Sequence, residues 1–295
     1  MATLAETQGA RQRSGNRGLA LVQRIDWVQI VLYILLTIGA VVSFVPFFWM
    51  ITSAFKLPQE VVAFPPVWFP SKPTMDNIIR IWDKLAFARY FANSMVLAVI
   101  PTVIILLTST LVGYVLAKYS FRGRDAFFLA ILATMMIPYP VTLIPSYQMM
   151  GWFHWLDTYW ALIVPGMFSS FGVFLVRQFM HSIPDDLLDA GRIDGASEYR
   201  IFFQLVLPLS VPVISALGIF HFMWNWDSFL WPLLVLNTQS KYTLPLALAT
   251  FTTQYITDYA STMAGAAISI APVLVVFLLL QRYFVAGVAM TGLKG

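Results

Sequence analysis

Long apolar runs alternate with short polar segments along most of the chain. Their length suits helices rather than strands, and six of them reach the roughly 20 residues that an α-helix needs to cross a bilayer. We therefore predict six transmembrane helices, at residues 27–51, 90–117, 126–149, 159–180, 208–236 and 263–284. The first run is too long for a signal peptide and lacks a small-residue cleavage site, so we interpret it as a retained anchor.

Composition supports a bilayer environment. Hydrophobic residues make up 59% of the 295 residues and charged residues only 11%, against about 25% charged residues in typical soluble domains. The mean hydropathy is +0.75. We therefore expect an all-α membrane protein. The chain has no cysteine, which excludes disulfides and thiol chemistry, and its net charge of +4 is too small to indicate nucleic-acid binding.

The positions of Lys and Arg predict the orientation in the membrane. Twelve of these 18 residues fall in the segments that are cytoplasmic if the N-terminus is inside, and positive charge favours the cytoplasmic side. Both termini are therefore expected inside, and Lys72 and Lys241 outside. The predicted parts are a cytoplasmic basic tail (1–26), an anchor (27–51), an extracytoplasmic loop (52–89), a transmembrane domain with a cytoplasmic segment at 182–207 (90–284), and a cytoplasmic tail (285–295).

The predicted outer loop is rich in proline and ends in a short amphipathic pattern. We expect a helix that begins at Thr74 or Asp76. Two interpretations of it stay open, namely a helix on the outer membrane surface or a cap packed over the helix bundle. The apolar positions on one side of this helix are Ile78, Ile79, Trp82 and Leu85.

A polar stretch, SIPDDLLDAGRIDGASEYRIFFQLVL, separates the fourth and fifth apolar runs. It predicts a first helix that begins at a capping box of Ser182 and Asp185 and ends near Ile193, a turn at Gly195, and a second helix capped by Ser197. Small side chains let a partner approach closely, and charges can pair at the rim of an interface. The stretch is therefore suited to docking, although an ordinary solvated loop has a similar composition. The residues with these properties are Asp189, Ala190, Gly191, Asp194, Gly195, Ala196 and Glu198.

The same stretch resembles the EAA signature of permease subunits of binding-protein-dependent ABC importers. That signature reads E-A-A, three residues, G, nine residues and I-x-L-P. Here 189–191, Gly195 and 205–208 occupy these places with the spacing kept, although Asp replaces Glu and Gly replaces the second Ala. The chain from Thr74 onward also resembles the carbohydrate-importer branch, in particular the type of the maltose system's smaller permease. The stretches that carry this second likeness are 137–165, 171–197, 224–236 and 281–295.

The resemblance implies a type I importer permease with six transmembrane helices and several partners. A second homologous permease would complete the translocation pathway, and the EAA-like segment 189–208 would dock on an ATPase dimer that binds Mg-ATP. A separate extracytoplasmic sugar-binding protein would deliver the carbohydrate. The chain itself is then expected to bind no cofactor or metal, and to lie among the lipids of a bacterial cytoplasmic (inner) membrane.

The motifs of common catalytic sites are missing from the sequence. There is no G-x-x-x-x-G-K-[ST] loop to bind phosphate and no H-E-x-x-H, and His154, His181 and His221 are far apart in the sequence. A membrane enzyme is therefore disfavoured. A self-sufficient secondary transporter is an alternative that would need paired ionisable residues within its spans, and a permease for a non-sugar solute such as glycerol phosphate is another.

The fifth predicted span carries polar and aromatic residues together, in HFMWNWDSFLW. Aromatic rings can pack on the C–H faces of sugars, and amides or carboxylates can bind sugar hydroxyls. We therefore predict that this stretch lines the translocation pathway, although interfacial tryptophans and polar residues that hold helices together have the same pattern. The candidates are His221, Trp224, Asn225, Trp226 and Asp227.

The predicted cytoplasmic tail, FVAGVAMTGLKG, is apolar and glycine-rich rather than polar. Related sugar permeases end similarly, which implies a tail that contacts the ATPase subunits. A lipid-surface anchor is the alternative. The proposed contact residues are Gly287, Gly292 and Lys294.

Overall fold

The computed structural model describes residues 27–84, 86–254 and 258–291, and the regular structure in these ranges is helical, without β-strands. The chain divides into two compact units, 1–49 and 50–295. Most of helix α2 (Trp27–Ala54) forms the described part of the first unit. None of its most apolar window is buried. Its 28 residues correspond to about 42 Å at 1.5 Å per residue. An exposed helix that is hydrophobic all round is suited to lipid, as predicted for the anchor.

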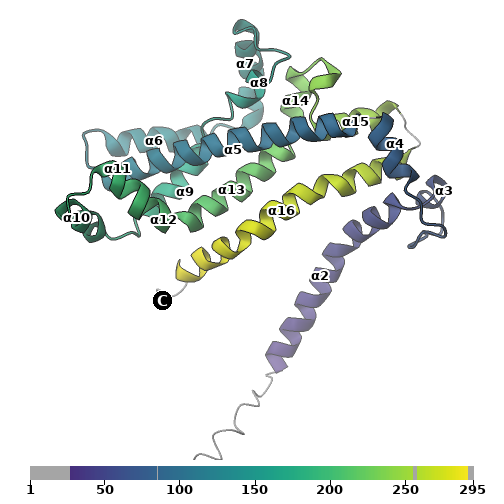
Figure 1. Cartoon of the computed structure of the whole chain (residues 1–295), viewed down its shortest axis with the longest axis horizontal. Helices are drawn as coiled ribbons and strands as arrows, with labels where there is room; N and C mark the ends of the chain where they lie inside the picture. Colours follow the sequence, from purple (N-terminus) through teal and green to yellow (C-terminus); the bar gives the residue numbers. More distant parts are fainter. Residues whose placement is uncertain (1–26, 85, 255–257, 292–295) are drawn as a thin grey trace, which may run out of the picture. The chain divides into compact units, whose positions relative to one another are not determined.

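Four helices form the centre of the second unit (Figure 1): α5 (Phe87–Lys118), α9 (Ser170–Met180), α13 (Val211–Trp226) and α16 (Tyr259–Thr291). Helix α5 packs against α9 and α13, and α13 packs against α16. A Cβ atom on Gly172 of α9 would lie 2.4 Å from Ser109 Oγ of α5, and one on Gly113 would lie 2.7 Å from a methyl of Val176. Small residues therefore let α5 and α9 approach closely, as is common between helices in membranes.

Bends between helices mark two of the predicted spans. The third comprises α6 (Arg124–Met135) and α7 (Tyr139–Trp152), which meet at 97°. Pro138 lies at this bend in extended conformation, and a proline disfavours helix in the residue before it. The fifth predicted span begins at a 72° bend between Glu198–Leu209 and Val211–Trp226.

The fourth predicted span is not one continuous helix. It consists of α8 (Trp160–Ile163) and α9, and Pro165 and Gly166 lie between them. After α13, the chain continues through α14 (Leu230–Val235), a 3₁₀ turn (Gln239–Lys241) and α15 (Leu244–Gln254). By length and composition, three described helices can cross a membrane, or up to five spans if each bent pair counts as one. Helix α9 is apolar but shorter than a full span.

Helix α16 corrects the predicted boundary of the C-terminal tail. We expected the helix to end near Phe284, but it continues to Thr291. Gly287 is therefore part of the helix backbone, whereas Gly292 and Lys294 lie outside the described residues. The residues 285–291 contain no proline or charge that would end the helix, and alanine and valine let it continue.

The short helix α4 (Asp76–Lys84) is a packed cap on its buried side. Ile81 is buried, and a Cβ atom on Gly265 of α16 would lie 2.4 Å from its Cδ1. Asn77 is buried as well, and its amide donates to the carbonyls of Ala54 and Lys56. The buried side therefore carries Asn77 and Ile81, whereas Ile79 and Trp82 of the side expected from the sequence are exposed. The other short helix of this loop is α3 (Pro58–Val61).

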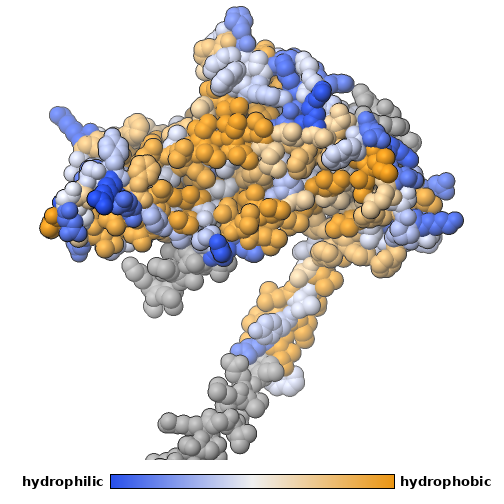
Figure 2. All heavy atoms as spheres, in the orientation of Figure 1, coloured by the Kyte–Doolittle hydropathy of each residue, from blue (hydrophilic) through white to orange (hydrophobic). Residues whose placement is uncertain are grey.

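Hydrophobic side chains cover the long side of the second unit, and hydrophilic ones gather at its ends (Figure 2). Exposed large hydrophobic residues come from all of the long helices, as on a surface that faces lipid. Examples are Val103, Leu107, Leu129, Val275 and Leu279.

Candidate functional site

The polar stretch between α9 and α13 folds as a helical hairpin. Helix α10 (Asp185–Ile193) and helix α11 (Glu198–Ile201) are joined by a turn at Gly195, and we call residues 185–201 the polar hairpin. Gly195 has φ +78°, a conformation that glycine adopts without strain. Ser197 caps α11 by accepting a hydrogen bond from the Arg200 amide. The end of the first helix, the turn and the second cap are therefore confirmed.

The predicted capping box at the first helix is wrong. The residue before α10 is Pro184, which makes no side-chain cap. The Ser182 hydroxyl instead donates to the Phe179 carbonyl of the preceding helix. Serine can return a hydrogen bond to its own backbone as easily as it can cap a following helix.

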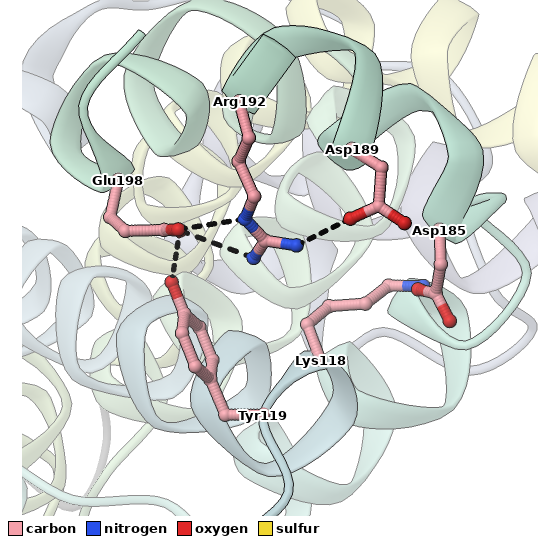
Figure 3. A network of polar contacts seen from close by, with 6 residues as sticks. All are labelled: Lys118, Tyr119, Asp185, Asp189, Arg192 and Glu198. Atoms are coloured by element: carbon pink, nitrogen blue, oxygen red, sulfur yellow. Dashed lines mark hydrogen bonds and ion pairs between the residues drawn. The ribbon is translucent and has the colours of Figure 1, made fainter. Parts of the chain in front are cut away.

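Arg192 is the centre of a polar network in the hairpin (Figure 3). Its Nη1 donates to Asp189 Oδ1 at 2.7 Å, and its Nε donates to Glu198 Oε1 at 2.8 Å. The hydrogen bonds that the Arg192 guanidinium donates to Glu198 and Asp189 raise its pKa above the ordinary value. The same contact with Arg192, with help from Tyr119, lowers the pKa of Glu198. The three side chains therefore form a charged cluster across the turn.

The C-terminal end of α5 holds the hairpin in place. Lys118 Nζ donates to Asp185 Oδ1 at 2.7 Å and to the Ile183 carbonyl, and only 2% of the Lys118 side chain is exposed. The Tyr119 hydroxyl donates to Glu198 (Figure 3). Both ends of the hairpin are therefore fastened to the helix that lies at the centre of the bundle.

Apolar packing joins the hairpin to the same helices. After α11 the chain continues through a π-helical turn (Phe202–Val206) into α12 (Leu207–Leu209). One apolar cluster contains buried residues from α5, α9, α10, α11, this turn and α13. Examples are Tyr114, Val176, Leu188, Ile201 and Val206.

The small residues of the hairpin divide between its surface and its interior. Ala190 and Gly195 are exposed, as predicted for a docking surface. Gly191 is half-buried, and a Cβ atom there would lie 3.2 Å from Ile201 and Leu205. Ala196 packs against the apolar cluster. Gly191 and Ala196 therefore contribute to packing inside the hairpin.

Sequence reasoning missed the two most exposed apolar side chains of the hairpin. Ile193 is 86% exposed and Tyr199 is 79% exposed. Asp194 next to Ile193 is exposed and makes no ion pair within the described ranges. The position of Ile193 between Arg192 and Asp194, at the end of a helix, could have indicated an exposed apolar residue.

A cavity of about 290 Å³ lies at the opposite end of α13 from the hairpin. Residues of α5, α7, α8, α13 and α14 line it, together with Pro165, Gly166, Ser228 and Thr243. We call it the Thr243 cavity. Of the five predicted pathway residues, Asn225 lines this cavity, and its amide also donates to Thr102 Oγ1 at 3.1 Å.

The other four predicted pathway residues lie outside the lining of the cavity. Trp226 is 2% exposed, and its indole N–H donates to the Ser269 carbonyl, so the structure gives it a packing role rather than a pathway role. Neighbouring residues of a helix differ by about 100° in direction, which separates Trp226 from Asn225. His221 is buried beside the half-exposed Trp224, with 5.0 Å between ring centroids. Asp227 is exposed at the end of α13.

Comparison with known proteins identifies the family. Residues 109–290 match the family described as binding-protein-dependent transport system inner membrane component. The chain is 38% identical over 268 residues to the arabinooligosaccharides transport system permease protein AraQ of Halalkalibacterium halodurans, covering 88% of this chain and 96% of the relative. It is 32% identical over 275 residues to the sn-glycerol-3-phosphate transport system permease protein UgpE of Escherichia coli, covering 90% and 98%.

A solved structure shares the fold. It belongs to a bacterial ABC transporter involved in the import of the acidic polysaccharide alginate, with 25% identity, a TM-score of 0.76, and coverage of 89% of this chain and 98% of that one. This chain therefore belongs to the family of inner membrane components of binding-protein-dependent transport systems. It is a transport component with the all-α permease fold predicted from its sequence, which sets aside the membrane enzyme and the self-sufficient transporter.

Proposed function

We propose that this chain is the transmembrane subunit of an ATP-driven sugar importer, forms half of its translocation pathway, and is moved by a separate ATPase through the polar hairpin. The observation that carries the proposal is the hairpin itself. Its network fastens it to α5, while the side chains of Ile193 and Tyr199 are largely exposed on it. Exposed apolar side chains rimmed by charge are typical of a protein interface.

The hairpin is built to transmit force. A displacement of Ile193 would be transmitted to α5 through the hydrogen bonds that join Arg192, Glu198 and Tyr119. It also reaches α9 and α13 through the apolar cluster. Packed cores shift as units rather than deform continuously. Displacement of the hairpin would therefore move the central helices together.

Several partners follow from this proposal. A dimeric ATPase would hold Mg-ATP, a second homologous permease would supply the other half of the pathway, and an extracytoplasmic binding protein would deliver the solute. The exposed helix α2 and the apolar sides of the bundle would contact membrane lipid. Relatives named for arabinooligosaccharide transport support a sugar as the solute. Both termini and the hairpin would be cytoplasmic, and loop 52–89 extracytoplasmic.

We also propose that the C-terminal tail of the chain contacts the ATPase. Gly287 lies in α16, and Gly292 and Lys294 follow this helix in the sequence. The helix brings the chain toward the end of the bundle where the hairpin lies (Figure 1), which is the end proposed for the ATPase.

A pair of matched isoleucines tests the docking surface. Ile193→Asp should prevent binding of the ATPase, because it places a charge in the apolar centre of the interface. Ile79 is also exposed, but it lies on α4, far from the hairpin in Figure 1. Ile79→Asp should therefore leave ATPase binding unchanged. Pull-down of the ATPase with the purified permease pair measures both, and normal binding by the Ile193→Asp complex would contradict the proposed docking surface.

A further inference from the structure

The Thr243 cavity has a lining whose polar groups are all uncharged. The residues that carry its chemistry are Tyr139, Ser146, Asn225, Ser228, Trp231 and Thr243. The remainder of the lining is Leu, Pro and Gly. The lining contains no Asp, Glu, Lys, Arg or His. A volume of about 290 Å³ lies near the lower end of the range for small-molecule sites.

One hydroxyl of this cavity is buried without a partner. Thr243 is only 4% exposed, and its Oγ1 forms no hydrogen bond among the described residues. Buried polar groups are nearly always satisfied, and an exception calls for an explanation. Thr243 lines the cavity, although its Oγ1 is covered in this structure. Rotation of the side chain about χ1 would bring the hydroxyl to a solute in the cavity and satisfy it.

Two neighbours of Thr243 are held in position for a solute. The Trp231 indole N–H donates to the Ala161 carbonyl at 2.8 Å, which fixes the ring at the wall of the cavity. The Asn225 amide nitrogen donates to Thr102, and this orients the amide so that its oxygen is left as an acceptor within the described part of the chain. A fixed aromatic face with nearby hydroxyl and amide groups suits a molecule that has both C–H faces and hydroxyls.

The charge of the lining restricts the solute further. An anion that entered would lose hydration without gaining a cationic partner, which is costly. One relative is named for the transport of arabinooligosaccharides and another for sn-glycerol 3-phosphate. Similarity alone therefore does not decide between an uncharged sugar and a phosphorylated solute.

We propose that the Thr243 cavity is a solute-binding site of this chain and that it selects uncharged saccharides over phosphorylated or acidic ones. This rests on the proposed function, since it assigns the solute class of that same pathway. Thr243 and Asn225 donate to and accept from sugar hydroxyls, and Trp231 packs against the sugar ring.

Cysteine protection in the assembled importer tests the site without relying on the binding protein's own selectivity. The chain has no native cysteine, so Ser146→Cys and Ser228→Cys give unique labels in the cavity. Labelling by a small neutral thiol reagent is measured in nanodiscs, with arabinotriose as the neutral probe and trigalacturonate as the acidic probe of similar size. We expect arabinotriose to slow labelling and trigalacturonate to have no effect. Equal protection by both probes overturns the selectivity, and protection by neither overturns the site.

A threonine pair tests the role of the unpartnered hydroxyl. Thr243→Val keeps the shape and removes the hydroxyl, and it should raise the arabinotriose concentration needed for half protection by roughly tenfold, as expected for one lost hydrogen bond to a solute. Thr142 of α7 bonds the Tyr139 carbonyl of its own helix, so Thr142→Val should leave that concentration unchanged. An unchanged value in Thr243→Val overturns the assignment of Thr243.

Failure of this inference can be told apart from failure of the proposed function. If the Ile193→Asp complex loses ATPase binding but no solute protects the cavity cysteines, the coupling proposal stands and the site does not. If arabinotriose protects the cavity while Ile193→Asp binds the ATPase normally, the site stands and the docking surface does not.

Discussion

Arg192 and Glu198 join the two helices of the polar hairpin across the turn at Gly195. Arginine Nε donates to Oε1 at 2.8 Å and Nη2 to Oε2 at 3.4 Å. Each side chain is about half exposed, with 39% and 47% of its surface accessible. Exposed ion pairs contribute about 0–1 kcal/mol to stability. The pair therefore defines the shape of the hairpin more than it stabilises the protein.

Arg192→Gln should separate coupling from stability. We expect a loss of about 1 kcal/mol or less in stability, but a several-fold decrease in substrate-stimulated ATP hydrolysis, because the two helices no longer move as one body. Arg200→Gln is the matched control, since Arg200 lies in the same hairpin and its guanidinium bonds the neutral Gln204 side chain. Thermal melting and ATPase assays in nanodiscs measure the two effects. Equal ATPase losses in both variants would show that the network has no special role.

The pH dependence of the hairpin follows from Glu198. Its pKa is lowered by Arg192 and Tyr119, so the folded value lies below the unfolded value of about 4.3. The stabilisation is therefore present above the unfolded pKa and is lost as pH falls through the folded pKa. We expect amide exchange in α10 and α11 to follow its normal base-catalysed slope between pH 6 and 8, and local protection to fall only below about pH 4. Glu198→Gln should show the reduced protection already at pH 7. A change in protection between pH 6 and 7 in the unmodified chain would contradict this assignment.

Gly195 allows a graded test of the turn. Its φ is +78°, and no atom lies within 4 Å of an added Cβ. Backbone strain rather than a clash therefore decides the outcome in this chain. Asparagine tolerates this conformation, whereas alanine costs roughly 1 kcal/mol. We expect near-normal transport for Gly195→Asn and a modest loss for Gly195→Ala. Gly195→Trp should insert normally but lose transport, because its ring would stand between the turn and the ATPase. Uptake by the assembled Gly195→Trp complex near the unmodified level would contradict docking at this turn.

Local sequence signals predicted the parts of the hairpin that depend on neighbouring residues. Ser197 and Gly195 were recognised because a cap and a left-handed turn have specific residue preferences. Arg192 was not recognised as the centre of the network, because its partners and Tyr119 meet only in three dimensions. Gly191 was predicted to be exposed, since no local signal shows that Ile201 and Leu205 pack on it.

The bends of the predicted spans and the lining of the pathway also depend on contacts that leave no local signal in the sequence. Apolar length located the helices, but the bends depend on Pro138 and on the chain around Ser210. In WNWD, composition could not separate Asn225, which lines the cavity, from Trp226, which is buried in the core. Nothing in the sequence around Thr243 marks it as a candidate binding residue, because the cavity that it lines is formed by segments far apart in the chain.

The contact between α5 and α9 predicts a specific rescue. Gly172→Ala would place a Cβ atom 2.4 Å from Ser109 Oγ, and overpacking of this kind costs about 1–3 kcal/mol. Ser109 Oγ is buried without a partner in the described chain, so Ser109→Ala alone should be close to neutral. The double variant should recover part of the loss, although Ser109 Cβ at 3.1 Å stays close. Melting of the four variants in a double-mutant cycle measures the coupling energy.

Gly39→Ala is the matched glycine control for this cycle. No atom lies within 4 Å of a Cβ atom added to Gly39 of α2, so this variant should be neutral or slightly stabilising. Additive effects of Gly172→Ala and Ser109→Ala would mean that the two residues do not limit the approach of α5 and α9.

The orientation of the bundle can be tested by cysteine labelling, because the chain contains no cysteine. Lys72, Asp194 and Ser240 are exposed, and the hairpin that carries Asp194 lies at the opposite end of the second unit from α4 and α15 (Figure 1). The bias of Lys and Arg toward the predicted inner segments predicts that the hairpin lies in the cytoplasm. An impermeant maleimide should therefore label Lys72→Cys and Ser240→Cys in intact cells. It should label Asp194→Cys and Gly9→Cys only after the membrane is permeabilised. Labelling of Asp194→Cys in intact cells would place the hairpin outside, where no ATP is available to a docked ATPase, and would contradict both the topology and the coupling role.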